Sequence, residues 1–101
     1  MVQEMKTIQS LNYQPAPVKG GYTDPILKVD LSTNDNTLAD LPPDFKNKYI
    51  GGRGYALKFI WDGVTGDTRH NSPENILVMA SGPLCNEPRF PGSGKFIVGT
   101  I

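Results

Sequence analysis

A run of five apolar residues, Ile76 to Ala80, constrains the fold of this chain more than any other feature. The run lies between a polar turn and a loop with three prolines and three glycines, and it predicts a buried strand. A second apolar strand begins at Phe96 and is still running at Ile101. Because a strand with bare edges needs neighbours, this ending predicts a truncated chain. A natural stop after a short last strand is the alternative.

The first half of the chain predicts an arm followed by a pair of strands. Residues 1–24 are polar and punctuated by proline and glycine, which is typical of an extended N-terminal arm. Residues 26–31 alternate between apolar and polar side chains and predict a strand. Residues 32–36 form a turn cluster, and residues 37–41 predict a short returning strand.

Two helical patterns follow. Prolines and an aspartate at 42–44 open the first, which carries apolar side chains at helical spacing and ends at Gly51-Gly52. The second covers residues 55–61, and three of its aromatic side chains are expected in the core: Tyr55, Phe59 and Trp61. The fold class predicted is α+β, a strand-rich domain with two short helices that is incomplete.

Charge and cysteine content exclude several classes of protein. Ten basic and ten acidic residues cancel and are interspersed, which argues against binding to nucleic acid or an anionic membrane. No apolar stretch approaches the length of a membrane span, and the start lacks the apolar run of a signal peptide. With one cysteine, Cys85, no internal disulfide can form. These features favour a cytoplasmic protein.

The segment Pro91-Gly92-Ser93-Gly94-Lys95 invites comparison with a phosphate-binding loop. It does not match one, because Arg89 stands where the first glycine is required and Phe96 stands where a hydroxyl residue is required. Two glycines still allow close approach of the backbone, and the lysine supplies a point charge for an anionic group. A glycine-rich turn with a solvated lysine is the alternative interpretation.

Gly51-Gly52-Arg53-Gly54 is a second candidate, which could present a guanidinium and backbone amides to a phosphate or carboxylate. It does not match the dinucleotide-binding pattern, because no third spaced glycine follows. From spacing alone, a helix C-cap and a hinge between two helices are favoured.

Other candidate sites are weaker. His70 is the only histidine and lies in a polar loop, where solvation is the usual state. A catalytic pair of Cys85 and His70 stays open, although nothing in the sequence brings them together. The pattern Asp30-x-Ser32-x-Asn34 starts like a calcium loop but lacks the glycine and glutamate that such a loop requires later.

Four segments in order resemble the N-terminal domain of the aldehyde ferredoxin oxidoreductase family, the tungsten-pterin enzymes. They are ILKVDLST, YIGGRGYALKFIW, SPENILVMASGPL and PGSGKFIVGTI, and they cover residues 25–101. SPEN followed by an apolar strand and GPL is the most specific of them. The arm before Tyr22 is longer than the usual start of the family.

The resemblance implies an α+β domain that forms a base beneath a tungsten (or molybdenum) bis-pyranopterin. It also implies a [4Fe-4S] cluster beside that cofactor and oxidation of an aldehyde, with water, to a carboxylic acid; some similar enzymes reduce activated aromatic rings. The metal carries the chemistry and the protein positions it. The implied partners are ferredoxin or another iron-sulfur subunit, the remainder of a parent polypeptide, and a second copy in a homodimer.

The resemblance also suggests which residues meet the cofactor. The family has a basic residue, usually arginine, just after the glycine turn, and the matching position here is Lys95, with Gly92, Ser93 and Gly94 in the turn. Lysine cannot make the forked contacts of arginine. Cys85 matches no cluster ligand. Since the cluster ligands of the family lie in later domains, we expect the 101-residue chain alone to be inactive.

Three hypotheses follow. The chain is the N-terminal piece of a tungsten-pterin, iron-sulfur oxidoreductase; or it is a non-catalytic partner or remnant of that fold; or it is a small phosphate-binding module built on its two glycine-rich segments.

Overall fold

Six short elements follow one another in a computed structural model that describes residues 3–101. Their bounds are β1 (Pro25–Asp30), β2 (Asp35–Asp40), α1 (Phe45–Tyr49), α2 (Gly52–Gly63), β3 (Val78–Ser81) and β4 (Phe96–Gly99). The strands form two antiparallel hairpins, β1–β2 and β3–β4, which are separate two-stranded sheets. The α+β class predicted from the sequence is confirmed.

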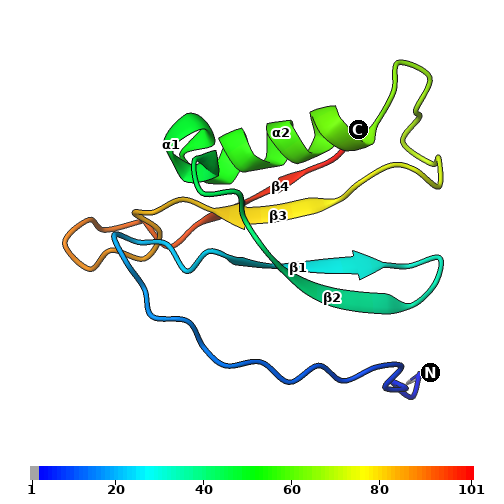
Figure 1. Ribbon diagram of the computed structural model, residues 1–101, viewed down its shortest axis with the longest axis horizontal. Helices are drawn as coiled ribbons and strands as arrows, with labels where there is room; N and C mark the ends of the chain where they lie inside the picture. Colours follow the sequence, from blue (N-terminus) through cyan, green and yellow to red (C-terminus); the bar gives the residue numbers. More distant parts are fainter. Residues whose placement is uncertain (1–2) are drawn as a thin grey trace.

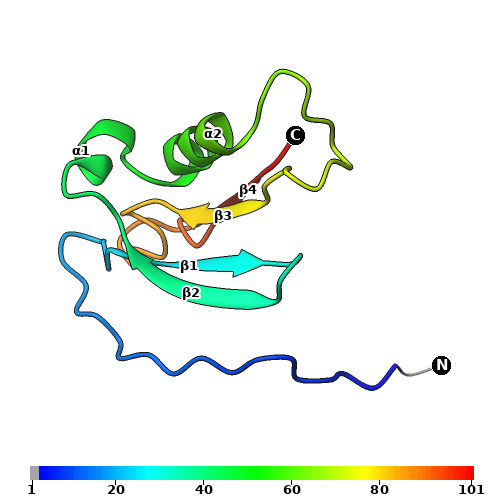
Figure 2. The ribbon, with the colours of Figure 1, turned by 45° about the vertical axis from the view of Figure 1, so that its right-hand side comes forward.

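The elements are arranged in tiers (Figures 1 and 2). In both views, α2 lies over the β3–β4 hairpin, and the β1–β2 hairpin lies on the far side of that sheet from the helix. Residues 3–18 have no helix or strand and run past β1 and β2 as an extended segment. Within the described residues, neither helix is long and apolar enough to cross a bilayer.

The β1–β2 hairpin forms because two alternating segments flank a tight turn. Leu27 lies opposite Leu38 in the register, so these side chains share one face. The Oδ1 atom of Asp30 accepts the backbone N–H of Ser32 at 2.8 Å, which fixes the turn. This bond accounts for the pattern that resembled the start of a calcium loop. β2 begins two residues earlier than predicted, at Asp35.

The β3–β4 sheet is covered by α2 on one face. Val78 pairs with Gly99, and Ala80 pairs with Ile97, so all four lie on the same face. A Cβ atom on Gly99 would lie 2.9 Å from the Cβ of Ala56 in α2. The helix therefore rests directly on the β4 backbone, and this contact requires glycine at that strand position.

The opposite face of this sheet is bare, which contradicts the prediction of a buried strand. Met79 is 66% exposed, Phe96 64% and Val98 52%. The apolar run is in place, but α2 covers one face only, and within the described residues the strands of the β1–β2 hairpin make no close contact with this sheet. The apolar run therefore forms a strand with apolar side chains on both faces of the sheet. The described residues bury only the face that packs on α2.

The two helices meet at a sharp break. Ile50 caps α1 in the left-handed region at φ +67°, which is costly for a β-branched residue. α2 begins at Gly52, three residues before the predicted start. Gly54 lies within α2, and this position requires glycine because a Cβ there would overlap the carbonyl of Tyr49. These glycines permit close packing of one helix end on the next, rather than a flexible hinge.

A small aromatic cluster forms the core. The ring of Phe45 lies 4.7 Å from that of Tyr49, 4.9 Å from that of Tyr55 and 5.3 Å from that of Phe59. The prediction that Trp61 joins this core is wrong, since Trp61 is 80% exposed. Tyr55 and Phe59 are four residues apart and share a helix face, whereas Trp61 is six residues from Tyr55 and points elsewhere.

The Tyr55 hydroxyl is buried without a hydrogen-bond partner within residues 3–101. Burial raises the pKa of this phenol above its ordinary value of 10.0, and the nearby Tyr22 and Asp24 raise it further. A buried hydroxyl without a partner opposes folding, because water satisfies it in the unfolded chain.

We therefore expect Tyr55→Phe to be neutral or to stabilise the chain by up to about 1 kcal/mol. Because the folded-state pKa lies above the unfolded one, the stability linked to this phenol is complete below pH 10 and is lost as pH rises through the folded value. An ultraviolet titration of phenolate, wild type minus Tyr55→Phe, should show that the Tyr55 phenol ionises above its ordinary pKa. A normal titration of that group, or a marked loss of stability, would contradict the assignment.

Candidate functional site

A loop of residues 82–95 joins β3 to β4 and carries the glycine turn. Because Ser81 pairs with Phe96, the two ends of the loop leave the sheet side by side. The thiol of Cys85 donates to the carbonyl of Lys95 at 3.1 Å, across the neck of the loop. The loop is therefore closed at its base.

Ser93 braces the middle of the loop. Its hydroxyl donates to the carbonyl of Glu87 at 3.1 Å. Its own carbonyl accepts the backbone N–H of Asn86 at 3.1 Å and that of Lys95 at 2.8 Å. The sequence places Ser93 among the cofactor-binding residues; in the structure, its hydroxyl proton is already used to hold the loop together.

The two glycines of the turn have different roles. Gly92 adopts φ +83°, in the left-handed region, and a Cβ there would meet nothing within 4 Å. Gly94 has no positive φ, and a Cβ there would meet only Asn86 Oδ1, at 3.4 Å. Gly92 is therefore required by the backbone conformation, and the space beside it is open to a ligand.

Lys95 stands at the end of the turn with its side chain exposed. The acidic group of the same loop is engaged elsewhere: Glu87 accepts from Arg89 Nε at 2.9 Å, and this hydrogen bond lowers the pKa of the Glu87 carboxyl. No ion pair within residues 3–101 involves the Lys95 ammonium. The turn thus presents an uncompensated positive charge to solvent, which suits an anionic group.

The structure brings the other glycine-rich segment to the base of this loop. A Cβ on Gly51 would lie 3.1 Å from the Cα of Gly82 and 3.1 Å from the carbonyl oxygen of Ser81. Gly52 is buried against the same segment, and Arg53 is exposed in the first turn of α2. Gly51–Gly54 is therefore the packed start of a helix.

The structure separates the residues of the proposed Cys85–His70 pair. His70 lies in the loop that leads into β3, and Cys85 lies in the loop that leaves it, at the other end of the hairpin (Figure 1). The Cys85 thiol is instead bonded to a backbone carbonyl. A catalytic pair of these two residues is ruled out by this arrangement.

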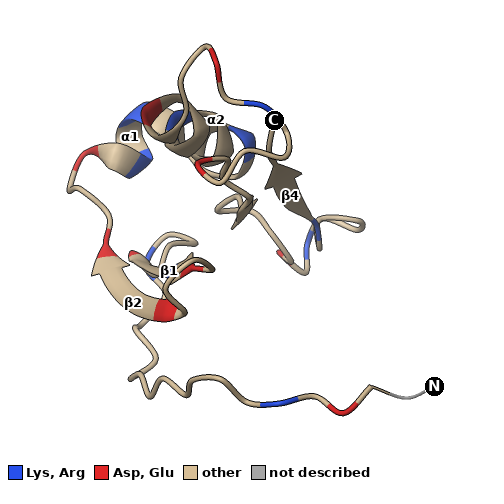
Figure 3. Cartoon of the chain, turned by 90° about the vertical axis from the view of Figure 1, so that its right-hand side faces the viewer, with Lys and Arg blue, Asp and Glu red and all other residues tan. Residues whose placement is uncertain are grey.

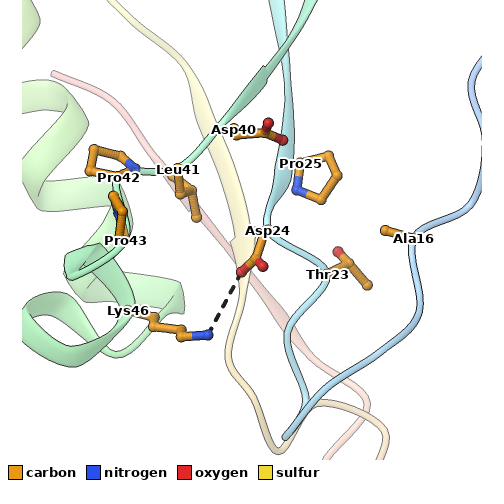
Figure 4. A pocket seen from close by; sticks show the side chains of 9 residues that line it. All are labelled: Ala16, Thr23, Asp24, Pro25, Asp40, Leu41, Pro42, Pro43 and Lys46. Carbon is orange, nitrogen blue, oxygen red and sulfur yellow. Dashed lines mark ion pairs between the residues drawn. The ribbon is translucent and has the colours of Figure 1, made fainter.

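One depression in the surface lies away from the glycine turn. Its volume is about 520 Å³, and it lies between the arm, the open end of the β1–β2 hairpin and the start of α1 (Figure 4). Asp24 and Lys46 face each other there at 4.0 Å. Across residues 3–101, no three histidine, cysteine or acidic side chains converge as a metal site. Basic and acidic residues are both spread over the elements of the chain (Figure 3).

Comparison with known proteins decides the family. The model of the aldehyde ferredoxin oxidoreductase N-terminal domain matches residues 26–101, which include both glycine-rich segments and Lys95. The chain belongs to the aldehyde ferredoxin oxidoreductase family. The family match begins at the second residue of β1, so the N-terminal arm, including residues 19–22, lies outside it.

Named relatives are tungsten-containing aldehyde ferredoxin oxidoreductases. The chain is 32% identical over 80 residues to that of Pyrococcus horikoshii, and 31% identical over 80 residues to that of Pyrococcus abyssi. Each alignment covers 79% of this chain and 13% of the relative. The relative from Pyrococcus furiosus is 31% identical over 74 residues, 73% of this chain and 12% of its own length. The chain thus spans about an eighth of the length of these family members.

Sequence reasoning missed two residues that help to build this region of the aldehyde ferredoxin oxidoreductase domain. Tyr22 donates its hydroxyl to the carbonyl of Ile50 at 2.6 Å, and the Cα of Gly21 lies against the backbone of Pro83. The available signal was the Gly20-Gly21 pair, which marks a tight turn. The contacts of that turn join segments 28 and more residues apart, and sequence spacing does not reveal them.

The different roles of the two glycines can be tested within one turn. Gly92→Ala forces an L-residue into the left-handed region, and we expect it to weaken the loop by about 1–2 kcal/mol. Gly94→Ala should cost less than about 0.5 kcal/mol, because a Cβ there meets only an ordinary contact. Limited proteolysis of residues 82–95 measures the difference, and equal cleavage rates in the two variants would refute it.

Proposed function

We propose that this chain is the N-terminal part of a tungsten-pterin, iron-sulfur oxidoreductase that oxidises aldehydes to carboxylic acids and passes the electrons to ferredoxin. Within it, Lys95 and its glycine turn form one wall of the pterin site. The observation that carries the proposal is the unpaired Lys95 ammonium on a braced, open turn inside the matched domain.

The residues of the turn fit an anionic, polar cofactor edge. The Lys95 ammonium can donate a charge-assisted hydrogen bond to a pterin or phosphate oxygen. Gly92 leaves open space beside the backbone, so a flat group can approach the main chain closely. When bound, the tungsten (or molybdenum) bis-pyranopterin supplies the two-electron oxidation of the aldehyde, and the protein orients it and sets its electrostatic surroundings.

Lysine limits what this wall can do. Arginine presents a planar fork that can bond two partners at once, whereas the lysine ammonium is a compact point charge on a flexible stem. We therefore assign Lys95 to one contact on the cofactor side, rather than to a bridge between pterin and cluster. Because solvent reaches the side chain from several sides, other groups must enclose it before that contact is strong.

We place the ligands of the metal and of the [4Fe-4S] cluster in the remainder of a parent polypeptide. The bare face of the β3–β4 sheet, with Met79, Phe96 and Val98, supports this placement, because a large apolar face on so small a unit requires cover. The proposed partners are that remainder, ferredoxin or another iron-sulfur subunit, and a second copy in a homodimer. The cytoplasm is the proposed compartment.

The native gene product tests the function directly. We expect a polypeptide several times longer than 101 residues that carries tungsten or molybdenum together with iron. The measurement is intact mass combined with elemental analysis of the protein isolated from its source. A metal-free product of 11.0 kDa would overturn the proposal and favour the non-catalytic remnant, for which lysine in place of the usual arginine is the supporting observation.

Substitution of Lys95 tests the site. In the complete parent, Lys95→Ala should lower the content of tungsten or molybdenum, or the rate of electron transfer, at least about tenfold, since a charged hydrogen bond contributes about 1.5–3 kcal/mol. Lys28→Ala removes another exposed lysine, in β1, and serves as the matched control. Lys95→Arg should retain loading. Unchanged metal content and activity in Lys95→Ala would show that the assignment is wrong.

A further inference from the structure

A tight turn in the N-terminal arm lies outside the matched domain. The backbone of Lys19 and that of Tyr22 exchange two hydrogen bonds, of 2.8 and 3.0 Å. Between them, Gly20 and Gly21 both adopt positive φ, +56° and +86°, as in the tightest hairpin turns. The arm therefore ends in a rigid hairpin that directs the chain into β1.

This turn contacts the break between the helices. The Tyr22 hydroxyl donates to the carbonyl of Ile50 at 2.6 Å. Ile50 is the residue that caps the C-terminus of α1, where the carbonyl groups have no partner within the helix. The Lys46 ammonium lies 5.6 Å from the centre of the Tyr22 ring and adds a weak attraction. Tyr22 thus caps α1 from outside, at the residue with left-handed backbone.

The same turn also contacts the base of the Lys95 loop. A Cβ on Gly21 would overlap the carbonyl oxygen of Pro83, so the two backbones touch. A Cβ on Gly20, in contrast, would meet nothing within 4 Å. The two neighbouring glycines therefore share a left-handed conformation, but only Gly21 is required for a contact.

A third contact closes the arrangement. Gly51 follows Ile50 and packs on Gly82, and Gly82 precedes Pro83. The arm turn, the helix break and the base of the loop therefore touch pairwise. The hydrogen bond from the Cys85 thiol to the Lys95 carbonyl then connects the start of the loop, next to Pro83, with its end at Lys95.

We propose that the turn of residues 19–22 is a clamp that holds the helix break against the base of the loop and so positions Lys95. Gly21 and Tyr22 are positioning residues, since they act through Pro83 and Ile50. The clamp explains why the arm before β1 ends in two glycines and a tyrosine. Only its effect on cofactor binding rests on the proposed function; its effect on the loop does not.

The neighbouring glycines provide the matched test, in the complete parent protein. Both Gly20→Ala and Gly21→Ala place an alanine in the left-handed region, which costs free energy in each variant. Only the Cβ of Gly21→Ala would overlap Pro83 and force it away. We expect hydrogen exchange of amides in residues 82–95 to accelerate at least about tenfold in Gly21→Ala and less than about threefold in Gly20→Ala. Amides of α2 from residue 56 to residue 63 should exchange as in the wild type in both variants. Equal acceleration in the two variants would overturn the clamp.

Tyr22→Phe is a second variant that tests the clamp, and it can be used if Gly21→Ala does not fold. It retains the ring and deletes only the hydrogen bond to Ile50, so we expect faster exchange at residues 50–54 and 82–95 with little change elsewhere. Unchanged exchange in those two segments would overturn the clamp. Metal content, measured on the same samples, separates the two proposals. Faster loop exchange with unchanged metal supports the clamp and counts against the Lys95 site, whereas loss of metal alongside it supports both.

Discussion

Close contact between backbones at glycine determines the layout of this domain. Gly51 against Gly82 sets the start of α2 on the exit of β3, and Gly99 lets α2 rest on β4. A Cβ atom at Gly51 or at Gly99 would lie 3.1 or 2.9 Å from its nearest neighbour, closer than an ordinary van der Waals contact, so the helix and the sheet would have to move apart. The aromatic core is too small to fix that geometry by itself, because it consists of four rings on two short helices. The glycines therefore define the position of α2 and, through it, that of the Lys95 loop.

The packing is unequal on the two sides of the β3–β4 sheet. Ala56 is 2% exposed where α2 meets the strands, yet Met79 on the reverse face stays largely open. This asymmetry accords with a chain that spans an eighth of the length of its relatives. The glycine turn, whose Lys95 ammonium forms no ion pair among residues 3–101, lies at the end of this sheet.

Local sequence patterns predict the helices and strands of this chain correctly, but they predict poorly how these elements pack. Alternation in 26–31 and the apolar run at 76–80 located β1 and β3, because strand periodicity is a property of neighbouring residues. The start of α2 was missed, because glycine normally ends a helix, and the contact of Gly54 with Tyr49 that overrides this preference is tertiary. Trp61 is 80% exposed because it lies six residues after Tyr55, off the helix face that Tyr55 and Phe59 share. For the candidate site, the resemblance predicts Lys95 and its turn, whereas the contacts of Gly21 and Tyr22 depend on segments distant in sequence.

The separation of its strands also bears on the order in which this chain folds. Four residues link β1 to β2, and fourteen link β3 to β4. Closing the longer loop costs about 1 kcal/mol more in chain entropy. The first hairpin and the helix pair can form from nearby residues, whereas β4 must find both β3 and α2 across long stretches of chain. We expect the turn that carries Lys95 to become ordered last, so the proposed cofactor-binding turn would form late in folding, on a scaffold already in place.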